Sequence, residues 1–136
     1  MNAQLTHLAL QVAKLDACVA FYEGYCNMNV VHDRTNNHKR VVWLASPGQE
    51  GRFVIVLLPG GTGEQQPAND FSHLGFALDS VDDVDAIAAR AREDGILIWE
   101  PVQEPYPVGY YCGVRDPDGN FVEFSFGQPV GTDKAD

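Results

Sequence analysis

The stretches LTHLALQV at residues 5–12 and FSHLGFAL at residues 71–78 decide the fold, because they are two copies of one pattern. Each is a strand-like run with a histidine at its third position, and each is followed by a helical stretch, to about residue 25 and to residue 94. Three more strand-like runs follow each helix, at 28–33, 39–45 and 53–58 in the first copy and at 97–100, 110–114 and 120–126 in the second. The repeat predicts an α+β fold made of two βαβββ modules.

The modules and their boundaries follow from turn and capping residues. Ser80, with Asp83 three residues later, is typical of a helix start, and Gly95 is placed to end that helix. We expect Asp16 to cap the first helix. The turn-rich segment PGGTGEQQP at 59–67 lies between the modules, and DPDG at 116–119 predicts a tight turn between two strands. We therefore expect one domain over residues 1–127, with modules at about 5–58 and 71–126, a linker at 59–70, and a polar tail at 128–136.

Composition excludes several classes of protein. The chain has 136 residues, 45% of them hydrophobic, which indicates a globular domain. Nine Lys and Arg against nineteen Asp and Glu give a net charge of −10, which argues against binding nucleic acid or anionic membranes. No apolar run is long enough to span a bilayer, and the first residues do not resemble a secretory signal. Three cysteines without a metal-binding spacing favour reduced thiols and a cytoplasmic location.

Strand alternation predicts the direction of three potential metal ligands. In the first strand of each module the large apolar side chains alternate, so we expect them to face the helix and His7 and His73 to lie on the opposite face. In the last strand the helix-facing residues are Val122, Phe124 and Phe126. Glu123 then shares the helix-free face. Two imidazoles and one carboxylate form a set that binds a divalent metal and leaves adjacent positions open. The alternative, that these are structural histidines and a solvated glutamate, is disfavoured by their equivalent positions in the repeat.

The repeat has a fourth equivalent position, and it is apolar. Glu123 follows His73 by 50 residues, and Val56 follows His7 by 49. The sequence therefore offers three ligands where a fully symmetric repeat would offer four.

The sequence resembles the vicinal oxygen chelate superfamily, which includes glyoxalases, extradiol dioxygenases, fosfomycin-resistance transferases and bleomycin-resistance proteins. The resemblance covers residues 5–126, and its motifs are HLALQV at 7–12, FY at 21–22, FSHLGF at 71–76 and DPDGNFVEF at 116–124. It implies that the modules form a half-open barrel of mixed sheet around a divalent metal ion (Fe, Zn, Mn or Ni) held by His7, His73 and Glu123. It also implies a homodimer, with the metal site inside one chain or shared between two.

The departures from the family pattern bear on the reaction. Members of the glyoxalase I type resemble this chain except that they carry a fourth, carboxylate ligand at the position of Val56. Fosfomycin transferases carry a hydroxyl-bearing residue where this chain has Ala9, and cationic residues near the C-terminus, where this chain has only Lys134 after Arg115. The resemblance therefore slightly favours dioxygenase-type chemistry on a small substrate that chelates the metal through two neighbouring oxygens.

Further residues have two interpretations each. Tyr111, if it shares the face of Glu123, can donate a hydrogen bond to a reacting oxygen, as a tyrosine does in ring-cleaving relatives, or it is a packing residue. His38 is an acid or base near the cavity mouth or part of a solvated hairpin loop. Residues 101–107 form a cavity rim or a surface loop, and we expect Cys112 to pack on the helix side.

Two other functions stay open. A glyoxalase-like lyase or isomerase would need another group to replace the missing carboxylate. A non-catalytic drug-binding protein, similar to the bleomycin-resistance members, would suit the net charge of −10, because that charge attracts cations. Such a protein needs no metal ligands, however, and this chain keeps three.

Overall fold

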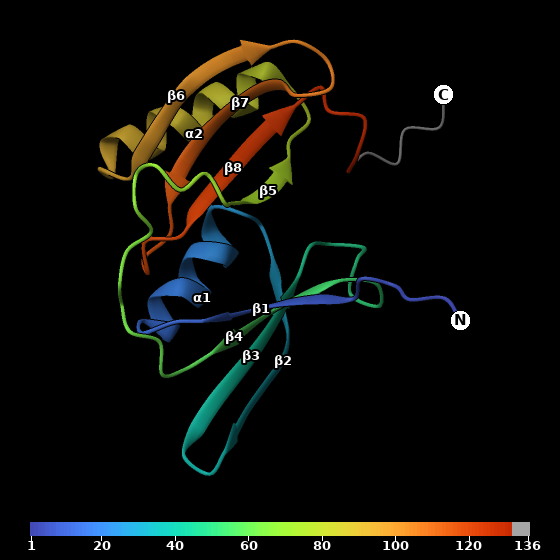
Figure 1. Cartoon of the computed structure of the whole chain (residues 1–136), viewed down its shortest axis with the longest axis vertical. Coiled ribbons are helices and arrows are strands. Elements are labelled where there is room, and N and C mark those ends of the chain that lie inside the picture. Colours follow the sequence, from blue (N-terminus) through green and yellow to red (C-terminus); the bar gives the residue numbers. More distant parts are fainter. Residues whose placement is uncertain (132–136) are drawn as a thin grey trace. The chain divides into compact units, whose positions relative to one another are not determined.

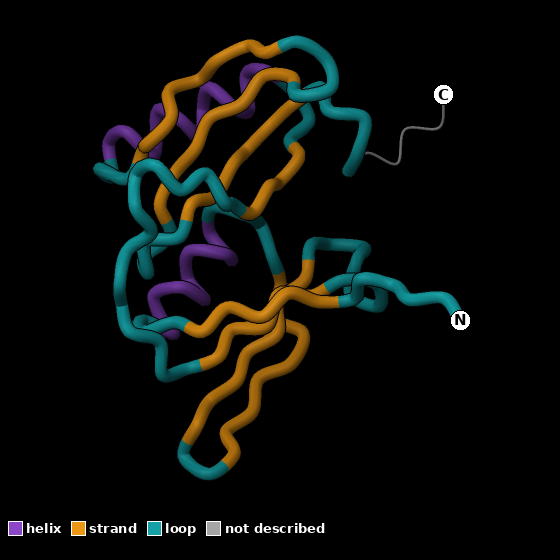
Figure 2. Tube along the Cα trace, in the orientation of Figure 1, coloured by secondary structure: helices purple, strands orange, loops and turns teal. Residues whose placement is uncertain are grey.

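The computed structural model describes residues 1–131 and divides into two compact units between Glu64 and Gln65, within the predicted linker. Each unit has one helix and one four-stranded sheet (Figures 1 and 2). The two units have the same order of elements.

The first unit follows the order strand, helix, strand, strand, strand. Its elements are β1 (His7–Gln11), α1 (Leu15–Gly24), β2 (Asn29–Asn36), β3 (Lys39–Ala45) and β4 (Val54–Leu58). The sheet order is β1-β4-β3-β2, in which β1 runs parallel to β4 and the other neighbours are antiparallel.

The second unit repeats this arrangement. Its elements are β5 (Leu74–Ala77), α2 (Val81–Glu93), β6 (Leu97–Glu104), β7 (Gly109–Arg115) and β8 (Phe121–Phe126). The sheet order is β5-β8-β7-β6, again with the first strand parallel to the last. The prediction of two βαβββ modules is therefore confirmed, and each module is a mixed four-stranded sheet.

In both units the helix covers one face of the sheet. Arg40 of β3 pairs with Asp16 of α1. Val42 and Leu44 lie on the same face of β3 as Arg40, and both are fully buried. In the second unit the Sγ atom of Cys112 in β7 lies 3.8 Å from the carbonyl oxygen of Val84 in α2. Cys112 thus packs on the helix side, as predicted. In each of these strands the residues that alternate with the helix-facing ones point away from the helix.

The capping predictions had different outcomes. Ser80 caps α2, since its Oγ accepts a hydrogen bond from the backbone N–H of Asp83 at 3.1 Å, and Gly95 follows the helix with a φ of 75°. The prediction for α1 is wrong: Lys14 stands at the N-cap without a side-chain cap, and Asp16 lies in the first turn. The carboxylate of Asp16 forms an ion pair with Arg40 instead of capping the helix.

The strand β6 is longer than predicted. It continues to Glu104, so residues 101–104 belong to the strand and not to a loop, and only residues 105–108 form the turn to β7. Pro101 is tolerated because β6 is an edge strand whose register with β7 shifts between Trp99 and Val102.

The predicted turn at 116–119 is confirmed, and it sets the register of β8. The Oδ1 atom of Asp116 accepts hydrogen bonds from the N–H groups of Asp118 and Asn120, both at 2.9 Å. Gly119 has a φ of 87°, which favours glycine, and its N–H donates to the carbonyl of Asp116. Glu123 then pairs with Gly113.

Neither helix within residues 1–131 is long and apolar enough to cross a membrane, since they have 10 and 13 residues. Part of the predicted tail, residues 132–136, lies outside the described residues.

Candidate metal centre

The helix-free face of the second unit holds a histidine and a carboxylate side by side. The Nε2 atom of His73, just before β5, lies 3.7 Å from Oε1 of Glu123 in β8. The Glu123 side chain is 10% exposed and that of His73 is 35% exposed. The alternation argument thus places Glu123 on the predicted face, buried under neighbouring side chains.

Backbone contacts fix the orientation of the His73 ring. Its Nδ1 atom lies 2.7 Å from the carbonyl oxygen of Phe71. Because a carbonyl can only accept, Nδ1 carries the proton in this contact, and Nε2 is the ring nitrogen that faces Glu123. A histidine held in this way by a carbonyl is typical of metal ligands.

Two glycines flank Glu123 in the sheet. Gly75 of β5 and Gly113 of β7 are the register partners of Glu123 on either side. A Cβ atom at position 75 would lie 3.6 Å from Oε2 of Glu123, and a Cβ atom at position 113 would overlap the ring of Trp99. The first distance is an ordinary van der Waals contact, whereas the second shows that the missing side chain at position 113 makes room for the Trp99 ring.

Trp99 fills the space above Gly113 and packs against the histidine. Its ring is edge-on to that of His73, with centroids 5.5 Å apart and planes at 88°, and also contacts Phe121 at 5.5 Å. The imidazole of His73 thus contacts both an aromatic ring and a carboxylate, which restricts how it can turn.

Tyr111 lies on the same face as Glu123, because it is two residues from Gly113 in β7. Burial, and then the negative charges of Glu104 and Glu123, raise the pKa of Tyr111 above its usual value. The hydroxyl therefore stays protonated at neutral pH and can donate. Tyr110 faces the other way, and its hydroxyl donates to Asp85 of α2 at 2.5 Å.

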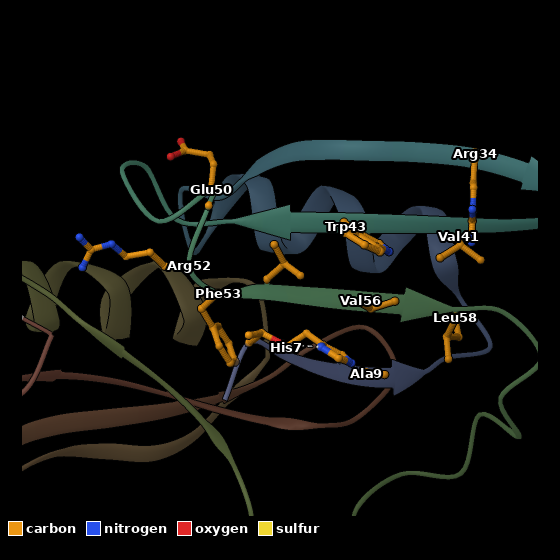
Figure 3. A pocket seen from close by; sticks show the side chains of 13 residues that line it. His7, Ala9, Arg34, Val41, Trp43, Glu50, Arg52, Phe53, Val56 and Leu58 are labelled. Carbon is orange, nitrogen blue, oxygen red and sulfur yellow. Dashed lines mark hydrogen bonds between the residues drawn. The ribbon is translucent and has the colours of Figure 1, made fainter. Parts of the chain in front are cut away.

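In the first unit His7 lines a pocket on the corresponding face (Figure 3). Its Nδ1 atom lies 3.0 Å from Oγ1 of Thr6. Ala9 pairs in register with Val56, as Gly75 pairs with Glu123. Val56 therefore occupies the position equivalent to that of Glu123, and it is 8% exposed among apolar neighbours.

The structure brings some of the predicted site residues together and leaves others apart. His73, Glu123 and Tyr111 share one face of the second unit, and His7 belongs to the first unit. Within residues 1–131 no three side chains of His, Cys, Asp or Glu gather into a group that could hold a metal. His38 is exposed in the two-residue turn between β2 and β3, with a φ of 65°, and does not line the pocket around His7.

The donors fit a divalent metal ion. An imidazole nitrogen and a carboxylate on the same face of the sheet are ligand types for Fe(II), Zn(II), Mn(II) and Ni(II). The only hydrogen bond recorded for the Glu123 carboxylate among the described residues is from Gln128, a long one of 3.4 Å, so the carboxylate retains acceptor capacity. His73 and Glu123 can each supply a ligand to the predicted set.

Sequence reasoning missed Trp99 and Gln128. One signal was present: Gly113 stands inside a strand on the face of Glu123, and a glycine there indicates close approach by another group. Nothing in the sequence pointed to Gln128, which reaches Glu123 from the segment after β8.

The comparisons with known proteins define the class. The profile of the Glyoxalase/Bleomycin resistance protein/Dioxygenase superfamily matches residues 4–124. The chain belongs to this superfamily, as the sequence motifs predicted.

The chain is also similar in sequence to individual proteins. The chain is 56% identical over 131 residues to an uncharacterized protein of Pseudomonas aeruginosa, covering 96% of this chain and 94% of that protein. It is 29% identical over 125 residues to biphenyl-2,3-diol 1,2-dioxygenase 3 of Rhodococcus globerulus, covering 90% of this chain and 63% of the dioxygenase.

Solved structures show the same fold. A glyoxalase/bleomycin resistance protein/dioxygenase domain from Frankia has a TM-score of 0.72 at 21% identity, covering 94% of this chain and all of that one. The fosfomycin resistance protein FosX of Listeria monocytogenes has a TM-score of 0.74 at 18% identity, covering 95% and 97%. A further structure of FosX contains Mn(II) and sulfate.

Proposed function

We propose that this protein is a divalent-metal-dependent enzyme in which His7, His73 and Glu123 hold the metal and a small substrate chelates it through two neighbouring oxygens. The observation that carries the proposal is the pairing of His73 with Glu123, 3.7 Å apart on the face of the sheet that the helix does not cover. The repeat supplies His7 as the third ligand. The proposal includes the half-open barrel around the metal and the homodimer expected from the family resemblance.

The metal, when bound, supplies Lewis-acid chemistry that stabilises the deprotonated form of a substrate with adjacent oxygens. The protein's own residues do the rest. Phe71 holds the His73 ring by its Nδ1–H, and Trp99 restricts the turning of that ring. Tyr111, which stays protonated, donates a hydrogen bond to a substrate oxygen.

Glu123 and His38 have further proposed roles. Glu123, as a carboxylate beside the substrate, is the group able to hold a proton during the reaction. His38 is proposed as an acid or base, and from its place in the β2–β3 turn it requires the tip of the hairpin to reach the substrate.

Dioxygenase-type chemistry, with Fe(II), is the preferred reaction class. Because Val56 stands where a fourth ligand would be, the metal has more than one coordination position left for the substrate and a second reactant. The similarity to a biphenyl-2,3-diol dioxygenase over 90% of the chain supports the same choice.

The alternatives differ in what they require. A glyoxalase-like lyase or isomerase keeps the metal but needs a base that Val56 cannot provide. A drug-binding protein is favoured by the net charge of −10, but Arg34 lines one end of the pocket of the first unit, which disfavours a cation at that end.

Elemental analysis of the chain, purified anaerobically without added metal or chelator, tests this proposal. Iron together with oxygen uptake on a panel of catechols supports the dioxygenase. Zinc, nickel or manganese with turnover of lyase, isomerase or thiol-transfer substrates supports the alternative enzyme. Absence of metal, even after reconstitution, contradicts both and leaves the drug-binding function.

A further inference from the structure

The pocket of the first unit is apolar along its floor. It has a volume of about 470 Å³, within the range of pockets for small organic ligands. Its floor consists of side chains on the helix-free face of the sheet: Val41, Trp43, Val54, Val56 and Leu58. Trp43 is 39% exposed, a large fraction for a tryptophan in the middle of a strand. The floor therefore suits a flat, apolar ligand.

The charged residues of the pocket are placed at its ends. Arg34 of β2 is the register partner of Val41, and Figure 3 shows it at the end of the pocket where Val41 and Leu58 lie. Glu50 and Arg52 lie toward the other end, and the Arg52 side chain points away from the remaining labelled side chains (Figure 3). Charge at that second end is balanced between one carboxylate and one guanidinium.

Among residues 1–131 Arg34 has no acidic partner, whereas three of the six arginines do. Arg40, Arg90 and Arg92 form ion pairs, and Arg115 donates to backbone carbonyls. Within residues 1–131 the structure records no hydrogen bond or ion pair for the side chains of Arg34 and Arg52. The nearest carboxylate in sequence, Asp33, is engaged by Arg40 on the opposite, helix-covered face at 2.8 Å. The Arg34 guanidinium, exposed at the end of an apolar pocket, is therefore available to form charge-assisted hydrogen bonds with an anion.

We propose that this pocket binds an organic anion, with its apolar, preferably aromatic, body against Trp43 and Val56 and its carboxylate on the guanidinium of Arg34. This inference rests on the proposed function in one respect, because it takes the ligand of this pocket to be the substrate. The substrate is then an aromatic acid whose other end points toward His7. An Arg side chain binds a carboxylate through two parallel hydrogen bonds, which gives the ligand a fixed direction along the pocket.

The test uses the metal-free, full-length protein and 3-phenylpropionate as the probe. Its neutral amide, 3-phenylpropanamide, has nearly the same shape, and 3-phenylpropylamine carries the opposite charge. Isothermal titration calorimetry gives the Kd values, and the fluorescence of Trp43 gives a second readout that is lost in Trp43→Phe. We expect the carboxylate to bind more tightly than the amide or the amine.

The variants separate Arg34 from general charge. Arg34→Gln raises the Kd for 3-phenylpropionate about tenfold, because it removes the positive charge and the pair of charge-assisted hydrogen bonds, and leaves the Kd for the amide nearly unchanged. Arg52→Gln is the matched control and leaves both nearly unchanged. Equal effects of the two variants, equal binding of acid and amide, tighter binding of the amine, or no binding overturns the inference. So does loss of probe binding as protein concentration rises, since a second copy would then occupy the face.

The outcome is separable from that of the proposed function. The binding assay contains no metal, so a protein that binds the probe through Arg34 but never acquires metal contradicts the enzyme and supports the anion pocket. A metal-loaded protein without this binding does the reverse.

Discussion

Val56 in β4 and Glu123 in β8 occupy equivalent positions in the two units. Each pairs in register with the residue two places after a histidine, Ala9 after His7 and Gly75 after His73. One position carries a carboxylate and the other an apolar side chain in a cluster with Ala45 and Val54. The two units thus have the same backbone arrangement but different capacity to bind a cation.

Val56→Glu tests what this difference does. We expect the new carboxylate to act as a fourth ligand, to alter the absorption spectrum of the Co(II)-substituted protein and to suppress a reaction that needs two open metal positions. Val56→Gln, nearly the same in shape but uncharged, is the control. An unchanged spectrum and unchanged turnover in Val56→Glu would show that position 56 does not face the metal.

Tyr111→Phe tests the proposed hydrogen bond to the substrate. We expect turnover to fall about 10²-fold with metal content retained, since the hydroxyl is lost and the ring remains. The matched control is Tyr110→Phe, because the Tyr110 hydroxyl donates to Asp85 on the helix side. That variant loses some stability but keeps its turnover. Equal turnover in the two variants would assign Tyr111 to packing.

Gly113→Ala tests whether Trp99 positions the site. The added methyl group overlaps the Trp99 ring, so we expect a loss of about 1–3 kcal/mol in the free energy of unfolding and weaker metal binding through His73. Gly51→Ala is the control, since a Cβ there meets nothing within 4 Å. Denaturant unfolding and metal titration measure both effects. If the two variants behave alike, the space above Gly113 is not constrained.

The raised pKa of the Cys112 thiol makes the stability of the fold depend on pH. Burial, and then the charges of Asp85, Glu123 and Glu100, raise the pKa of Cys112 from 9.0 to about 11. Above pH 9 the thiol ionises in the unfolded chain but not in the folded one, so the free energy of unfolding falls as pH rises toward 11. Cys112→Ala lacks this contribution. The difference in stability between wild type and variant should therefore shrink over this window, and a constant difference would refute the assignment.

Sequence reasoning could find the fold because the decisive signals are local. The repeat around His7 and His73, the Ser80 cap and the Asp116 turn each depend on residues close together in the chain. Strand alternation also placed Glu123 and Cys112 on the correct faces, since direction in a strand depends only on position.

The features that sequence reasoning missed depend on contacts between distant residues. The role of Asp16 is set by Arg40, which is 24 residues away in sequence. The continuation of β6 through Pro101 is possible only because that strand lies at the edge of its sheet. Trp99 reaches His73 across two intervening strands, and no local pattern encodes such a contact.

The metal content of four single variants is the most direct test of the central claim. His7→Gln, His73→Gln, Glu123→Gln and the control His32→Gln, whose ring packs on Trp43, are purified in the same way as the wild type, and circular dichroism checks that each is folded. We predict about one divalent ion per chain in the wild type and in His32→Gln, and a large loss in the other three. Folded His73→Gln and Glu123→Gln proteins with the wild-type metal content would contradict the account.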